Sequence, residues 1–188
     1  MYRAVALAVL QSNVDPADTE AVGSLAESVS IDLVGEADDL KVTLNGQDVT
    51  NEIRGEAVTE MSSIISTIPA VRRAMVARQR EMGQRGAVLN GRDIGTVVFP
   101  NADIKFFLTA SADERAQRRF REEHGQHPEV SFSETLAEMT ERDRRDSSRS
   151  DSPLKIAEDA IVIDSSSLSI EEVLKRMLAA VRERQVEN

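Results

Sequence analysis

The sequence predicts an α/β fold in which helices flank a mostly parallel sheet. Three short apolar runs, at residues 87–89, 104–108 and 160–163, have the length and near-continuous hydrophobicity of buried parallel strands. Longer helical patterns separate these runs, and such alternation is typical of an α/β domain. Three strands are few for this architecture, so we expect that a central strand is missing from the sequence.

Start signals mark four helices. A proline in the first turn opens the helix predicted over residues 69–80. A serine followed three residues later by a glutamate, the capping-box pattern, opens the other three. These pairs are Ser111 and Glu114, Ser131 and Glu134, and Ser169 and Glu172. The helix from Ser111 is predicted to run through Glu123, and the last helix carries a 3.6-residue apolar stripe from Ile170 to Val181.

Residues 29–49 break the alternation of strands and helices. Residues 30–34 and 41–44 are β-rich, and Asn45-Gly46 is a strong signal for a hairpin turn. We therefore predict a small antiparallel insertion that ends near Arg54.

The charge pattern narrows the class of ligand. A net charge of -10 argues against a nucleic-acid partner, because binding to a phosphate backbone needs a basic face. Only four of the 23 basic residues are lysines, and the rest are arginines. Arginine is suited to bidentate contacts with phosphate. A small anionic ligand in a local pocket is one interpretation, and a helical surface rich in ion pairs is the other.

The sequence predicts a cytoplasmic protein with no membrane partner. No apolar run approaches the ~18 residues of a membrane span, and the first ten residues lack a signal-peptide cleavage site. The chain contains no cysteine, which fits a reducing compartment. We interpret His124 and His127 as surface residues, since no partner has the spacing of a metal ligand.

The segment from Gly91 to Pro100 directly follows the first apolar run. In open α/β sheets the ligand site lies beyond the carboxyl ends of the strands. Glycines flank Arg92 and Asp93 and let the backbone approach a ligand closely. A guanidinium can bind an anion while the adjacent carboxylate accepts from a base amino group. Taken alone, the spacing favours an ordinary exposed turn, and a ligand-binding turn is the alternative.

A second charged segment, Glu141 to Arg149, ends the helix that begins at Ser131. Arg142, Asp146 and Arg149 are spaced i, i+4 and i+7, so they share one helical face. One interpretation is a solvated face of ion pairs. The other is a mobile lid whose arginines neutralise phosphate charge, as phosphoryl transfer requires.

Together these two segments resemble bacterial cytidylate (CMP/dCMP) kinases, whose fold is that of the P-loop nucleoside monophosphate kinases. The resemblance runs in collinear order along essentially the whole chain. The opening Met1–Leu7 resembles the family's segment after its phosphate loop and first helix, and the hairpin resembles its nucleotide-binding insert. The resemblance implies phosphoryl transfer from ATP to CMP or dCMP, with Mg²⁺ bridging the phosphates.

The resemblance also implies roles for single residues. The CMP phosphate is expected to bind Arg3, Arg92 and Arg149. The cytosine edge is expected to contact Ser63, Arg72 and Asp93, and the ribose Arg142 and Asp146. The expected catalytic group is Arg92, Arg142 and Arg149, and the ATP phosphates are assigned to Arg115 and Arg119. No metal ligand is expected in the chain.

The resemblance further implies how the chain is organised. We expect one kinase domain over residues 1–188 with an incomplete core. Within it we expect the nucleotide-binding insertion over residues 26–65 and a lid region over residues 120–150. The full-length protein is expected to be a monomer.

One family motif is missing from the sequence. None of the four lysines lies in the Gly-Lys-[Ser/Thr] context of the phosphate-binding loop. We therefore expect the 188-residue chain to lack its first strand, loop and helix, to be poorly stable or self-associating, and to be inactive alone. The alternatives are a catalytically dead nucleotide-binding paralogue with a regulatory role, and a related kinase for UMP, AMP or shikimate.

Overall fold

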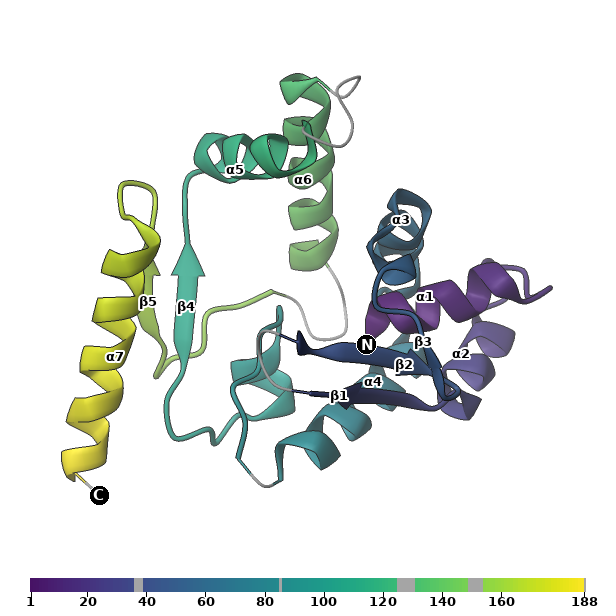
Figure 1. The fold of residues 1–188 in the computed structure, drawn as a ribbon, viewed down its shortest axis with the longest axis horizontal. Helices are drawn as coiled ribbons and strands as arrows, with labels where there is room; N and C mark the ends of the chain where they lie inside the picture. The colour runs from purple at the N-terminus through teal and green to yellow at the C-terminus, as the bar shows by residue number, and fades with distance from the viewer. Residues whose placement is uncertain (36–38, 85, 125–130, 149–153, 188) are drawn as a thin grey trace. The chain divides into compact units, whose positions relative to one another are not determined.

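The computed structural model describes residues 1–35, 39–84, 86–124, 131–148 and 154–187. The chain falls into two compact units, Met1–Val88 and Leu89–Asn188, and Figure 1 shows the elements of each. We call them unit 1 and unit 2 and describe each by itself. The predicted boundaries of domain, insertion and lid stay predictions.

Unit 1 consists of helices and one small antiparallel sheet. Its elements are α1 (Tyr2–Gln11), α2 (Thr19–Ser28), β1 (Ile31–Val34), β2 (Lys41–Leu44), β3 (Gln47–Asp48), the 3₁₀-helix η2 (Glu52–Arg54), α3 (Glu56–Ile65) and α4 (Pro69–Gly83). The helix predicted over residues 69–80 is confirmed, with Pro69 in its first turn.

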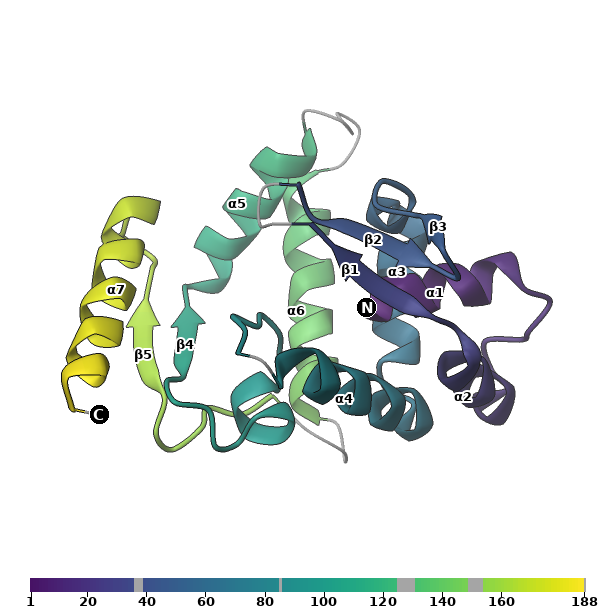
Figure 2. The same cartoon turned by 60° about the horizontal axis from the view of Figure 1, so that its bottom comes forward.

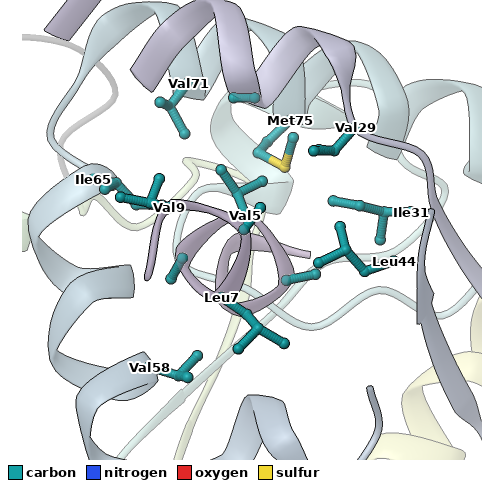
Figure 3. Packing of buried hydrophobic residues seen from close by; sticks show 14 of the residues in the cluster. Val5, Leu7, Val9, Val29, Ile31, Leu44, Val58, Ile65, Val71 and Met75 are labelled. Atoms are coloured by element: carbon teal, nitrogen blue, oxygen red, sulfur yellow. The ribbon is translucent and has the colours of Figure 1, made fainter. Parts of the chain in front are cut away.

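The core of unit 1 is built around α1. Every residue from Ala4 to Val9 is buried, so this helix is enclosed on all sides rather than amphipathic. Figure 3 shows Val9 on the side of Ile65 and Val5 on the side of Met75, within one cluster of buried apolar residues. Helices α3 and α4 therefore pack on the core through one face and can present polar side chains on another.

The predicted hairpin is confirmed as a three-stranded antiparallel meander, which both ribbon views show (Figure 2). Strand β1 pairs with β2, and β2 pairs with β3. Asn45 and Gly46 form the turn between β2 and β3 with φ values of 51° and 81°. These left-handed values suit Asn-Gly and explain why the pair was a reliable signal.

Unit 2 contains a parallel strand pair and three helices among its described residues. Its elements are the π-helical turn η3 (Ile94–Val98), β4 (Phe106–Thr109), α5 (Ala112–His124), α6 (Phe132–Ser148), β5 (Ile161–Asp164) and α7 (Ile170–Glu187). The rings of Phe120 and Phe132 meet edge to face, with centroids 6.1 Å apart, and join α5 to α6.

Strands β4 and β5 pair in parallel, with Phe106 opposite Ile161 and Thr109 opposite Asp164. This pair confirms two of the three predicted strands and the α/β class, and α7 runs beside β5 in Figures 1 and 2. The strand predicted over residues 87–89 is wrong. No strand of the described sheets pairs with this segment, and Val88 is fully exposed. An apolar run without a hydrogen-bonding neighbour does not form a strand.

The three capping boxes differ in the structure. Ser131 and Glu134 form the reciprocal pair, as do Ser169 and Glu172. At Ser111 only half of the box forms. Ser111 Oγ accepts from the Glu114 backbone N–H, but the Glu114 carboxylate accepts from Arg118 instead.

The apolar stripe of α7 is covered unevenly. Val173 and Met177 are half-buried, whereas Ile170, Leu174 and Leu178 are exposed. Among the helices in the described ranges, none is both long enough and apolar enough to cross a membrane.

Candidate functional site

The Gly91–Pro100 segment contains a single π-helical turn over Ile94–Val98. The carbonyl of Ile94 accepts from the backbone N–H of Phe99 at 2.7 Å, and the carbonyl of Asp93 accepts from that of Val98 at 3.3 Å, each five residues further along the chain. Single π turns are frequent at functional sites. The turn leaves Asp93 buried and Arg92 exposed, next to each other in the chain.

The glycines of this segment are needed for close packing. A Cβ at Gly91 would lie 2.8 Å from the Ile94 side chain, and one at Gly95 would lie 3.1 Å from Lys105 Cδ. Neither glycine has a positive φ. The sequence argument that small residues allow close approach holds, but the partners in this structure are Ile94 and Lys105.

Lys105 anchors the far end of the same segment. Its Nζ donates to the carbonyl of Pro100 at 2.5 Å and to both carboxylate oxygens of Asp159 at 2.7 and 2.8 Å. The hydrogen bond from Lys105 lowers the pKa of the Asp159 carboxyl below its ordinary value. Lys105 is buried, so one side chain ties the turn to the chain just before β5.

Arg92, Arg115, Asp143 and Asp146 form a cluster in unit 2, which we call the arginine–aspartate cluster. Arg92 Nη1 lies 3.5 Å from Asp143 Oδ1 and 3.6 Å from Asp146 Oδ2. Arg115 Nη1 donates to Asp143 Oδ2 at 2.5 Å. The turn, α5 and α6 thus bring two guanidinium groups and two carboxylates together, with formal charges that balance.

The two carboxylates of the cluster differ in how deeply they are buried. Asp146 is 2% exposed, and its backbone carbonyl accepts from the Leu154 N–H at 2.9 Å. A carboxylate this buried is not part of a solvated face of ion pairs, so that interpretation fails for Asp146. Arg142, one turn earlier in α6, is half-buried.

Two further arginines, Arg119 and Arg149, were predicted for this site. Arg119 is half-buried in α5. In the same helix, Arg115 also donates from Nε to the Ala110 carbonyl at 3.2 Å. Arg149 lies outside the residues that the structure describes, so its predicted phosphate contact stays a prediction.

The other predicted residues belong to unit 1. Arg3 in α1 donates from Nη1 to the Ile53 carbonyl at 3.1 Å. Ser63 is half-buried in α3. Arg72, in the first turn of α4, is 3% exposed and donates from Nη1 to the Ser66 carbonyl at the end of α3. A cation favours the carbonyl end of a helix, which accounts for this placement.

Sequence reasoning missed two residues of this site. Asp143 lies in the charged segment and is spaced i, i+3 from Asp146, so helical spacing could have found it. Lys105 stands inside an apolar strand run, and a charge in that position was the available signal. Across the described ranges, no group of three or more His, Asp or Glu residues could hold a metal ion.

Comparisons with known proteins agree on one family. A profile of the family described as Cytidylate kinase matches residues 1–183. The cytidylate kinase of Solibacter usitatus is 50% identical over 187 residues, which are 98% of this chain and 79% of that protein. The cytidylate kinase of Geobacter sulfurreducens is 46% identical over 186 residues, which are 98% of this chain and 80% of that protein. The cytidylate kinase of Bacillus subtilis is 44% identical over 185 residues, which are 98% of this chain and 83% of that protein.

Proposed function

This chain belongs to the cytidylate kinase family of phosphotransferases, and on that premise we propose that it serves phosphoryl transfer from ATP to CMP or dCMP. The products are ADP and CDP or dCDP. The arginine–aspartate cluster carries the proposal, because Arg92 and Arg115 from different elements meet there. Phosphoryl transfer depends mainly on positioning and on neutralising phosphate charge, which such arginines provide.

Recognition of cytosine is assigned to Ser63, Arg72 and Asp93. The Asp93 carboxylate would accept from the C4 amino group, while Arg72 would donate to N3 and O2. Both side chains are buried, and burial makes a mismatched base costly because it leaves a polar group unpaired. Uracil carries an oxygen at C4, which a carboxylate repels.

Phosphates and ribose are assigned to the remaining residues. The acceptor phosphate would bind Arg3, Arg92 and Arg149, and the ribose would contact Arg142 and Asp146. Arg115 and Arg119 would face the ATP phosphates.

Mg²⁺ is proposed as a partner of ATP. In the described residues, no group of three or more His, Asp or Glu side chains could hold a metal ion. Mg²⁺ would neutralise charge on the phosphates of ATP. We place the reaction in the cytoplasm, where ATP is the donor.

The alternative to kinase activity is a regulatory role, and a measurement of turnover separates the two. A nucleotide-binding protein with a regulatory role would bind CMP without turning it over. For the 188 residues alone we expect CMP binding and no turnover. Steady ADP production in a coupled assay with CMP and Mg-ATP would contradict the second expectation.

Calorimetric titration of the chain with CMP, UMP and AMP tests the base assignment. We expect CMP to bind at least about tenfold more tightly than UMP or AMP, as a charge-assisted hydrogen bond allows. Asp93→Asn should weaken CMP binding by about tenfold and narrow the preference over UMP, because an amide can also donate. Asp103→Asn, an exposed aspartate nearby in the chain, is the matched control and should change neither. A preference for AMP would overturn the assignment.

A further inference from the structure

Asp143 lies between the arginine assigned to the acceptor phosphate and the arginine assigned to the donor phosphates. We infer that Asp143 is a positioning residue that couples Arg92 to Arg115. A ligand bound to one arginine then changes the affinity of the other arginine for phosphate. This inference rests on the function proposed above, since that function assigns the two arginines to different phosphates.

The geometry of the carboxylate supports this coupling. Oδ1 of Asp143 faces Arg92 Nη1 at 3.5 Å, and Oδ2 accepts from Arg115 Nη1 at 2.5 Å. Each oxygen therefore serves a different arginine, and the arginines come from the Gly91–Pro100 segment and from α5. The aspartate itself lies in α6, which fixes its backbone independently of both partners.

The two contacts are unequal. The contact with Arg115 is a short charge-assisted hydrogen bond, whereas 3.5 Å to Arg92 is a looser ion pair. Arg115 is further fixed by its Nε bond to Ala110, and Arg92 also lies near the buried Asp146. Arg115 is therefore the partner that holds the Asp143 carboxylate.

Coupling follows from this inequality. A phosphate on Arg92 has to compete with the negative charge of Asp143. While Arg115 holds that charge, Arg92 can bind the phosphate. When Arg115 is removed, or binds a phosphate itself, the Asp143 carboxylate pairs with Arg92 alone. The carboxylate then competes more strongly with the acceptor phosphate for Arg92.

Four proteins test the inference: the wild-type chain, Asp143→Asn, Arg115→Met and the double variant. Each is titrated with CMP and with cytidine, which lacks the phosphate. Asp143→Asn should tighten CMP binding by about two- to fivefold, the range of a partly exposed ion pair. Arg115→Met should weaken it by a similar factor. The double variant should match Asp143→Asn, because Arg115 acts through the missing carboxylate. Cytidine binding should not change.

Additive effects of the two substitutions, or no change of CMP binding in Asp143→Asn, would overturn the inference. Glu141→Gln is the matched control, since Glu141 also pairs with arginines on α6 but outside the cluster, and it should leave CMP binding unchanged. Asp143→Ser replaces Asp143→Asn if that variant does not fold.

Failure of the proposed function would be visible separately. If the wild-type chain prefers AMP or UMP, the base assignment fails, and the same four proteins are then titrated with pyrophosphate. The same non-additive pattern with pyrophosphate supports the coupling, and an additive pattern overturns it.

Discussion

The two units of the chain are stabilised by different interactions. In unit 1 the apolar faces of helices and strands meet in one cluster of buried side chains around α1 (Figure 3). In the described part of unit 2, the buried apolar residues are Val98, Ala116 and Ile163. Unit 2 instead depends on polar contacts such as those of Lys105 and Arg115.

This difference has a consequence for stability. Burial of apolar surface contributes roughly 25 cal/mol per Å² and does not depend on protonation. Ion pairs and capping bonds contribute less, and they respond to pH and salt. Unit 1 should therefore resist acid and salt, while unit 2, whose described part buries fewer apolar residues, should unfold at milder conditions.

The largest expected effect is in the core of unit 1. Ile65 is fully buried, so Ile65→Ala should lower the free energy of unfolding by about 2–5 kcal/mol in urea titrations. Ile170→Ala is the matched control in unit 2, where the isoleucine is 83% exposed and its truncation should have little effect. Equal losses of unfolding free energy in the two variants would show that the two units do not differ in their dependence on buried apolar residues.

A smaller effect is expected at Lys105 in unit 2. Lys105→Met leaves the Pro100 carbonyl without its donor and should cost about 1–2 kcal/mol of unfolding free energy. The contact with Asp159 adds little, because that carboxylate is 63% exposed. Lys155→Met, at an exposed lysine, serves as the comparison. A neutral result at Lys105 would show that the turn does not depend on this anchor.

The smallest effect is a pH dependence of the same variant. The hydrogen bond from Lys105 holds the pKa of Asp159 below its ordinary value, so this carboxylate stabilises the fold above its unfolded pKa. The contribution is lost as the pH falls through the lowered pKa. The difference in unfolding free energy between wild type and Lys105→Met should therefore shrink in acid, measured by urea unfolding between about pH 3 and pH 7. A difference that grows in acid would have the wrong sign.

Local signals in the sequence predicted most of the structure. The Asn45-Gly46 turn, the proline at the start of α4 and two complete capping boxes depend on neighbouring residues, and each formed as expected. The strand over residues 87–89 failed because a strand needs a partner that local sequence does not specify. The half-formed box at Ser111 failed because Arg118, one turn further along α5, competes for Glu114.

For the candidate site, the sequence predicts a chemistry but not the contacts between side chains. Clustered arginines and the Gly-Arg-Asp segment indicated a phosphate ligand, and the family resemblance supplied the roles. The sequence could not show that Asp143 lies between Arg92 and Arg115, because the Gly91–Pro100 segment, α5 and α6 meet only in the folded chain. Nor could it show that Asp146 is buried.

The central proposal is that this chain binds CMP through the residues assigned to it. Amide hydrogen exchange with and without CMP tests it most directly, since exchange reports local opening in each unit separately. We expect CMP to slow exchange in the first turns of α4, around Arg72, and also in the Ile94–Val98 turn after Asp93. Unchanged exchange at both segments would contradict the account.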